Sequence, residues 1–232
     1  EVLASAKSPT TKEDLRVCIC GAIDQLPQDL AKQATIVALS TTLATNACVE
    51  GKGARAKLII MGMPQATLPS MKVKETYGID PAQVLCLPTK SSFDGTVVNH
   101  PDWEEVVRDN AAWFADAQAI AVTEMNALRN GGMMERVEVE YLEQALGVPV
   151  IAASNVANEI NMIERGATAL LNARLMPVVE SFLEAVRVSL HERGIDVSPM
   201  IVRSDGSFMN VEQAHECAVQ TIVSGPAASV QG

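Results

Sequence analysis

The chain has 232 residues, of which 48% are hydrophobic and 20% charged, and its formal net charge is −10. These values are typical of a soluble globular protein with one large domain or two smaller ones. The acidic balance and the scattered Lys and Arg residues argue against nucleic-acid binding, which requires clustered basic side chains. No apolar run approaches the roughly 20 residues of a membrane span, and the first residues do not resemble a signal peptide.

The five cysteines are odd in number and widely spaced. In a chain of this size they indicate reduced thiols and a cytoplasmic protein rather than a disulfide framework. On a helix, Cys18 and Cys20 would point about 200° apart, which disfavours a shared metal or redox role. The three histidines lie far apart in the sequence, so we expect no metal site.

The first predicted elements are a helix and two strands. Residues 10–13, Thr-Thr-Lys-Glu, have the pattern of a capping box, and apolar residues from Leu15 to Leu26 follow at helical spacing. The apolar run 34–39 predicts a strand covered on both faces, and residues 55–61 predict the next strand.

A polar, hydroxyl-rich segment, STTLATNACVE (40–50), lies between these two strands. It predicts a short helix that Ser40 or Thr41 caps and that Gly51 and Gly53 stop. Capping accounts for one hydroxyl group but leaves the others unexplained, so the segment is either a helix start or a site.

The remaining residues alternate between helical and strand patterns, which predicts an α/β domain with a largely parallel or mixed sheet. Pro177 lies inside a long helical pattern, which predicts two helices or one kinked helix, and Gly194 is a C-terminal stop. In chain order we expect a hairpin-like excursion (62–100), a helix from Pro101 and Asp102 to Phe114, a strand (119–123), a helix (133–146), a strand (148–154), the long helical segment (159–193), a strand and turn (199–208), a helix (211–218) and a strand that runs into a helix start (219–232).

Three segments share one pattern, an apolar run followed by Ser, Thr or Gly and a helix start: 34–46, 200–207 and 221–229. In open α/β sheets ligands bind beyond the carboxyl ends of strands, and helix N-termini suit phosphate or carboxylate groups. Each segment alone is better explained as a helix cap, whereas three in one chain favour a site and simple capping equally. No Walker loop, nucleophile elbow or carboxylate pair accompanies them, so the residues alone indicate anion-binding loops and no reaction.

Residues 40–62, STTLATNACVEGKGARAKLIIMG, resemble the stretch G-T-T-x-A-T-N-A-x-x-E-x-K-G-A-R of the hydantoinase/oxoprolinase family. That family includes the A-type subunits of N-methylhydantoinases and of acetone and acetophenone carboxylases. Residues 7–15, 164–196 and 200–232 are similar to further family segments in the same order. The resemblance covers nearly the whole chain and is weakest from 62 to 135.

The resemblance implies an α/β fold of the actin/Hsp70/sugar-kinase ATPase type, with a mixed sheet flanked by helices. Residues 1–155 would form a hydantoinase/oxoprolinase N-terminal-type domain, and residues 156–232 would begin the hydantoinase A-type domain. The fold is expected to be incomplete, because the two D-x-G-G-T-x-T-D hairpins that hold phosphate in such proteins do not occur in this sequence. They would lie before Glu1 and after Gly232.

The sequence departs from the family pattern at four places. Ser40 replaces a glycine, ERGATA (164–169) replaces E-R-T-S-T-T and retains only Thr168, and SDGS (204–207) replaces S-N-G-G. The segment H-S-Y-R-N-P-x-H-E corresponds to residues 123–138, which lack its histidines and tyrosine. These departures leave the fold prediction intact and place the substrate class in doubt.

Three functions are compatible with the resemblance. The first is a portion of an ATP-dependent amidohydrolase, a hydrolase that opens hydantoin- or 5-oxoproline-like cyclic amides. The second is an ATP-dependent carboxylase subunit of the acetone or acetophenone type. The third is a catalytically silent lobe that binds a partner subunit, to which the Met-rich segments 131–137 and 161–176 are suited, although core packing is the better explanation of these methionines. Binding to a B-type subunit and self-association are both compatible with the sequence.

In the first interpretation, the polar segment lines the cleft beside the γ-phosphate or the ring amide, and the 221–229 segment shapes a hinge helix. The catalytic candidates are Thr41, Thr42, Thr45 and Asn46. The cofactor-binding candidates are Ser204, Asp205, Gly206, Ser224, Gly225 and Pro226. The implied cofactors are ATP and Mg²⁺, and no residue is assigned as a metal ligand.

We expect this chain alone to have no turnover and to bind ATP weakly or not at all. Phosphoryl transfer requires Mg²⁺ and clamped β- and γ-phosphates, and residues 1–232 lack both phosphate hairpins. Isothermal titration of the chain with Mg-ATP measures this directly, and a micromolar Kd would contradict the expectation.

Overall fold

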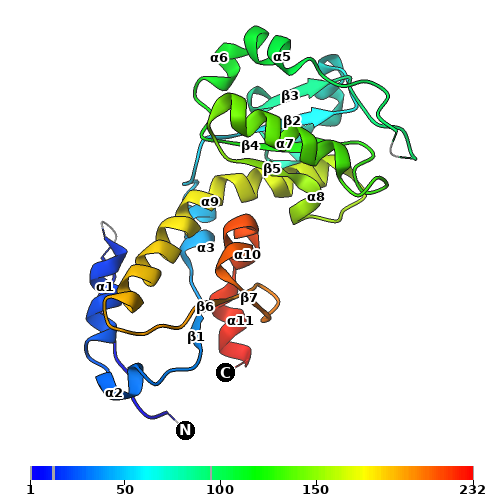
Figure 1. Ribbon diagram of the computed structural model, residues 1–232. Coiled ribbons are helices and arrows are strands. Elements are labelled where there is room, and N and C mark those ends of the chain that lie inside the picture. The colour runs from blue at the N-terminus through cyan, green and yellow to red at the C-terminus, as the bar shows by residue number, and fades with distance from the viewer. Residues whose placement is uncertain (1, 12–13, 95, 232) are drawn as a thin grey trace. The chain divides into compact units, whose positions relative to one another are not determined.

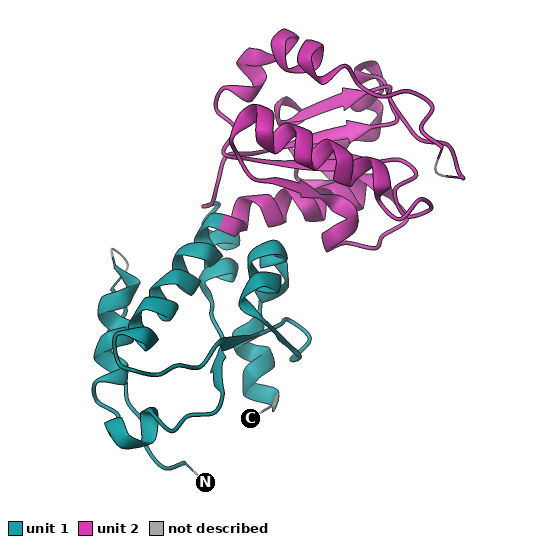
Figure 2. Ribbon diagram, in the orientation of Figure 1, with its two compact units in different colours: residues 1–51, 177–232 teal, residues 52–176 magenta. Residues whose placement is uncertain are grey.

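A computed structural model describes residues 2–11, 14–94 and 96–231. The chain forms two compact units, whose elements are labelled in Figure 1 and which are coloured separately in Figure 2. Unit 1 contains residues 1–51 and 177–232, and unit 2 contains residues 52–176. Each unit has its own sheet and helices, so the predicted α/β class is confirmed.

Unit 2 is built on a four-stranded parallel sheet of order β3-β2-β4-β5. Its central strands, β2 (Ala56–Met61) and β4 (Ala119–Glu124), are buried at every position. Continuous apolar runs of this kind are what a strand covered on both faces requires. The outer strands are β3 (Val84–Leu87) and β5 (Val150–Ala152).

Two apolar clusters cover the two faces of this sheet. On one face, the first half of α9 (Met162–His191) packs with the short helix α4 (Val73–Tyr77). On the other face lie α5 (Trp103–Asp109), α6 (Ala111–Phe114) and α7 (Met133–Leu146). Shorter elements complete the unit: η1 (Gln65–Met71), η2 (Pro81–Gln83) and α8 (Ala153–Val156).

Two predictions for unit 2 require correction. The 62–100 excursion is not a hairpin, because β3 pairs parallel to β2, with Leu58 opposite Val84. The helix from Asp102 to Phe114 begins as predicted, since Asp102 accepts the N–H of Glu105, but it breaks at Asn110.

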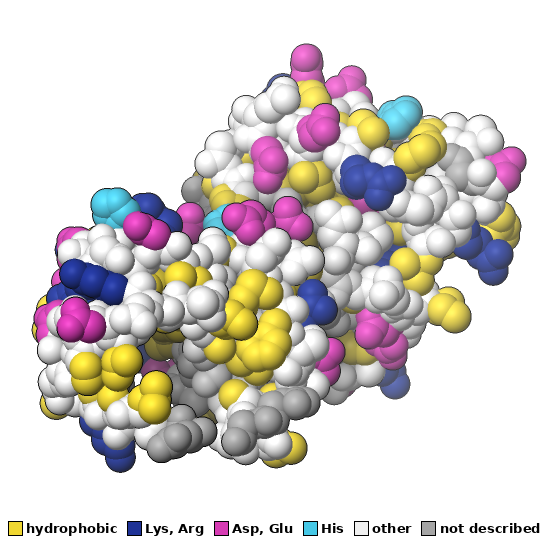
Figure 3. Space-filling view, turned by 60° about the horizontal axis from the view of Figure 1, so that its bottom comes forward, with side chains coloured by type: hydrophobic (Ala, Val, Ile, Leu, Met, Phe, Trp, Pro, Cys, Tyr) yellow, Lys and Arg dark blue, Asp and Glu magenta, His cyan; other side chains and the backbone are white. Residues whose placement is uncertain are grey.

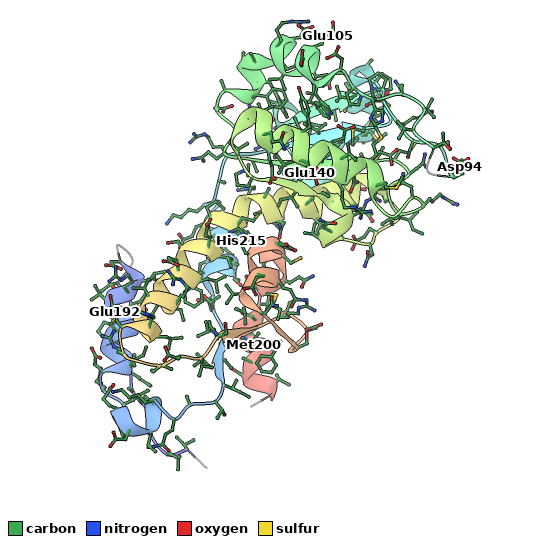
Figure 4. The ribbon with its side chains drawn as sticks, in the orientation of Figure 1. Asp94, Glu105, Glu140, Glu192, Met200 and His215 are labelled. Atoms are coloured by element: carbon green, nitrogen blue, oxygen red, sulfur yellow. The ribbon has the colours of Figure 1, made fainter. Side chains whose placement is uncertain are left out.

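Unit 1 contains a three-stranded mixed sheet of order β1-β6-β7. Strand β1 (Val37–Leu39) pairs parallel to β6 (Pro199–Val202), and β6 pairs antiparallel with β7 (Phe208–Met209). Met200, labelled in Figure 4, is the β6 residue opposite Ala38.

Helices on unit 1 pack their apolar side chains with this sheet. The second half of α9 contributes Val186 and Leu190, which cluster with side chains of α1 (Leu15–Ile23) and β1. The other helical elements are α2 (Gln28–Ala31), α3 (Leu43–Val49), α10 (Val211–Glu216), η3 (Ala218–Thr221) and α11 (Ser224–Gln231).

Three details of unit 1 differ from prediction. Strand β1 is not covered on both faces, because Ala38 is exposed. Helix α1 is capped by Asp14, whose side chain accepts the N–H of Arg16, while residues 12–13 of the predicted capping box lie outside the described residues. Residues 219–223 do not form a strand, since η3 occupies most of this segment.

Helix α9 is one helix with Pro177 inside it, and Gly194 follows its end with a φ of +64°. On the face that Figure 3 shows, Lys and Arg side chains stand singly or in small groups among acidic ones. No helix in the described part of the chain has the length and apolar character needed to cross a bilayer.

Gly53 is a position in unit 2 where a side chain does not fit. Its φ is +132°, and a Cβ there would lie 2.5 Å from the carbonyl oxygen of Arg174. We therefore expect Gly53→Ala to destabilise the fold by about 3 kcal/mol, measured by chemical denaturation. Gly147→Ala is the matched control, because Gly147 also has a positive φ but meets nothing within 4 Å. Its cost should be about 1 kcal/mol, and equal costs for the two variants would contradict the steric argument.

Candidate functional site

The polar segment after β1 forms a short helix, α3, as predicted, but the helix begins later than expected. The Thr41 hydroxyl accepts the N–H of Leu43 at 3.1 Å, while Thr42 occupies the N-cap position without a capping side-chain bond. Gly51 follows the helix with a φ of +64°. Capping therefore accounts for the Thr41 hydroxyl but not for Thr42.

The start of α11 is hydrogen-bonded to this segment. The buried Ser224 hydroxyl donates to the carbonyl oxygen of Thr41 at 3.0 Å, and it also lies 3.3 Å from the Thr41 N–H. The N–H of Val223 donates to the Thr45 hydroxyl at 2.9 Å. A Cβ at Gly225 would contact the Thr42 methyl group at 3.6 Å. The structure thus brings together two of the three segments that the sequence pattern identified.

A pocket of about 310 Å³ lies beside this junction, within unit 1. Among the described residues, no lining side chain carries a formal charge, and hydroxyl groups, a thiol and apolar groups line the pocket. The lining residues are Thr10, Leu15, Cys18, Ile19, Ser40, Thr41, Thr42, Leu43, Phe182 and Gly225.

Three further candidates lie close to the pocket residues in the chain. Thr45 and Asn46 come one turn later in α3, and the Asn46 amide nitrogen is 3.5 Å from the Thr42 hydroxyl oxygen. Pro226 is exposed in the first turn of α11, where proline fits a helix well. Thr45 and Asn46 bond within the junction, and none of the three residues lines the pocket.

The segment 204–206 forms the tight turn between β6 and β7. The Ser204 N–H donates to the carbonyl oxygen of Gln220 at 2.8 Å, and Gly206 turns the chain with a φ of +83°. Because β1 and β6 are parallel, this turn and Ser40 follow carboxyl ends at the same sheet edge. Ser204, Asp205 and Gly206 are nevertheless not among the residues that line the pocket.

A buried polar group in unit 2 was missed by the sequence analysis. The Glu124 carboxylate accepts the N–H and the hydroxyl of Ser91 at 3.0 and 2.9 Å. Arg165, fully buried, donates to the carbonyl oxygen of Glu124 at 2.6 Å. The Glu135 carboxylate accepts the N–H groups of Glu124 and Ser154 at 2.7 and 2.8 Å.

These groups come from five separate segments, so no spacing in the sequence indicates that they meet. The one available signal is Glu124, a charged residue at the end of an apolar strand. Burial raises the pKa of Glu135, against the lowering effect of its hydrogen bonds with Ser154 and Glu124. Every carboxylate oxygen named here is hydrogen-bonded to protein, which is the pattern of a structural network.

The described residues contain no cluster of three or more His, Cys, Asp or Glu side chains arranged to hold a metal ion.

The fold and the pocket together define an α/β protein with a hydroxyl-lined pocket beside a parallel strand pair. A comparison with known protein families identifies the family to which this α/β protein belongs. Residues 1–144 match the hydantoinase/oxoprolinase N-terminal region, and residues 165–232 match the hydantoinase/oxoprolinase domain. The chain therefore belongs to the hydantoinase/oxoprolinase family, and the predicted domain division after residue 155 lies between the two matches and stays a prediction.

Two relatives match along nearly the whole chain at low identity. The acetophenone carboxylase gamma subunit of Aromatoleum aromaticum is 25% identical over 98% of this chain and 35% of its own length. The caprolactamase subunit alpha of Pseudomonas jessenii is 23% identical over 97% of this chain and 35% of its own length. The chain thus spans about a third of the length of these relatives.

Solved structures show the same fold. A nucleotide-free acetone carboxylase has a TM-score of 0.78 at 18% identity, covering 97% of this chain and 36% of the neighbour. The ATP-dependent caprolactamase of Pseudomonas jessenii has a TM-score of 0.75 at 23% identity, covering 99% of this chain and 37% of the neighbour.

The Asp205 carboxylate provides a test of the β6–β7 turn. The hydroxyl and N–H of Ser207 donate to it at 2.6 and 2.9 Å and hold its pKa below the ordinary value. A lowered pKa means that this carboxylate favours the folded turn above its ordinary pKa, and that the contribution disappears as the pH falls through the folded value. Ser207→Ala removes the hydroxyl donor, so we expect the Asp205 pKa to rise in an NMR titration. Ser229→Ala should leave it unchanged, and an equal rise in both variants would contradict the assignment.

Proposed function

We propose that this chain is part of an ATP-dependent enzyme that opens a cyclic amide, with the pocket beside Thr42 facing the ring amide. The observation that carries the proposal is the lining of this pocket, in which several hydroxyl groups meet and no described side chain is charged. Membership of the hydantoinase/oxoprolinase family supports the reaction class. The relative named caprolactamase acts on a cyclic amide by its name, which favours the amidohydrolase function.

The chemistry of the pocket suits an amide better than a triphosphate. An amide offers one carbonyl acceptor and one N–H donor, and a hydroxyl group satisfies either. A triphosphate and its Mg²⁺ need cationic side chains and carboxylates, and neither occurs among the described residues that line the pocket. Thr42 is exposed, so its hydroxyl is the group that we assign to the ring amide.

ATP and Mg²⁺ belong to the proposal as cofactors of the whole enzyme, where ATP activates the amide carbonyl by phosphoryl transfer. The pocket residues do not fit Mg²⁺, and we route no step through the metal. The turn of Ser204, Asp205 and Gly206 and the α11 start of Ser224, Gly225 and Pro226 stay our candidates for the nucleotide side of the cleft. An actin-like arrangement of two lobes and a cytoplasmic enzyme with a B-type partner subunit are parts of the same proposal. The two relatives are named as a gamma subunit and a subunit alpha, which supports the proposal of a partner subunit.

The alternative is a carboxylase subunit, favoured by the similarity to the acetophenone carboxylase gamma subunit and to acetone carboxylase. ATP hydrolysis by the whole enzyme separates the alternatives. Stimulation by 5-oxoproline, hydantoin or caprolactam supports the amidohydrolase, whereas stimulation that requires bicarbonate with acetone or acetophenone supports the carboxylase. Hydrolysis that responds to neither set would overturn both and leave the silent, partner-binding lobe.

Thr42→Ala tests the assigned hydroxyl in the whole enzyme. We expect turnover of the cyclic amide to fall by at least about tenfold, corresponding to about 1.4 kcal/mol of transition-state stabilisation. The melting temperature should change little, because an exposed hydroxyl contributes little to core packing. Thr35→Ala, at an exposed position before β1, is the matched control. Wild-type turnover in Thr42→Ala would remove Thr42 from the site.

A further inference from the structure

The backbone is strained where α11 begins. Val223 has a φ of +62°, and in the described part of the chain only Lys72 shares a positive φ without being glycine. The left-handed region is unfavourable for any L-residue and most unusual for a β-branched one. The Val223 side chain is 47% exposed, so burial of that side chain does not offset the strain. A contact made by its backbone is the available explanation.

That contact is the hydrogen bond from the Val223 N–H to the Thr45 hydroxyl, at 2.9 Å. The next residue, Ser224, is fully buried and bonds both backbone groups of Thr41 through one hydroxyl. Thr41 directly precedes Thr42 in the chain, and Thr45 lies three residues after Thr42 in the first turn of α3. We call these three hydrogen bonds among Thr41, Thr45, Val223 and Ser224 the clasp.

Donor and acceptor counting separates the roles of the hydroxyl groups. The Ser224 hydroxyl has one proton, which goes to the Thr41 carbonyl oxygen, so it has none to donate to a ligand. The Thr41 and Thr45 hydroxyl oxygens each already accept a backbone N–H. The Thr42 hydroxyl has only the long 3.5 Å contact with the Asn46 amide. Of these four hydroxyl groups, that of Thr42 is the least committed to the fold.

We propose that the clasp is a positioning device in which Thr45 and Ser224 hold Thr42 toward the pocket, with the strained Val223 kept in place by Thr45. Thr45 then acts through Thr42 and does not itself contact the substrate. This assignment refines the catalytic role that the family resemblance suggests for Thr45, and it rests on the proposed function only for the identity of the ligand that Thr42 meets.

The test pairs Thr45→Val with Thr45→Ser. Valine has nearly the shape of threonine but cannot accept the Val223 N–H, whereas serine can. In the labelled 232-residue chain, we expect hydrogen exchange of the Val223 amide to accelerate by about tenfold in Thr45→Val and to stay near wild type in Thr45→Ser. In the whole enzyme, kcat for ATP-dependent opening of the cyclic amide should fall by about tenfold in Thr45→Val and recover in Thr45→Ser.

One control and two readouts keep the outcomes separate. Thr35→Val repeats the substitution at an exposed site outside the clasp. Unchanged exchange of the Val223 amide in Thr45→Val would overturn the clasp, whether or not turnover is found. Faster exchange with unchanged kcat per folded molecule would overturn the positioning role and leave a structural contact. If the wild-type enzyme opens no cyclic amide, the proposed function fails, and the exchange measurement still decides whether the clasp exists.

Discussion

The parallel pairing of β1 with β6 is the constraint on which unit 1 depends. It places Val37 opposite Pro199 and Leu39 opposite Ile201, joining segments from the two ends of the chain. Only three residues of β1 take part, so the strand pair needs support from the packing of Val186 and Leu190 against α1 and β1. Because the pair is parallel, Ser40 and Arg203 both leave the sheet at its carboxyl edge, and the pocket and the β6–β7 turn lie on that side.

Unit 2 differs from unit 1 in what supports its sheet. Its central strands are buried along their full length, so its sheet is held by apolar area on both faces. Buried polar side chains occur near the ends of these strands, at Lys57 in β2 and at Thr123 and Glu124 in β4. Glu124 and Ser91 are both hydrogen-bonded to protein. The two units thus differ in the state of the polar groups near the carboxyl ends of their strands. In unit 2 the polar groups are buried and bonded to one another, whereas in unit 1 the Thr42 hydroxyl is exposed beside a pocket.

Sequence patterns correctly predicted the elements whose conformation depends mainly on residues close together in the chain. The runs at 55–61 and 119–123 are largely apolar and became β2 and β4. Patterns failed where a tertiary contact decides the conformation. Residues 219–223 contain β-branched residues typical of a strand, yet the Thr221 hydroxyl bonds the Ala218 carbonyl oxygen in a 3-10 turn. The polar segment at 40–50 was identified from composition. Which of its groups are hydrogen-bonded within the fold depends on Ser224, far along the chain, and no local pattern reveals these contacts.

The departures from the family pattern have local physical reasons in this structure. Gly166 stands where the family has threonine, and a Cβ there would lie 3.0 Å from a methyl carbon of Thr123 and 3.3 Å from the side chain of Leu58. The lost hydroxyl is therefore linked to close packing of α9 on the central strands. In the β6–β7 turn, Asp205 and Ser207 replace asparagine and glycine together, and the Ser207 hydroxyl bonds the Asp205 carboxylate. Ser40 needs no glycine, because its φ is not positive. These changes adjust packing and turns while leaving the Thr42 hydroxyl exposed, so they argue for a site whose surroundings have changed more than its polar core.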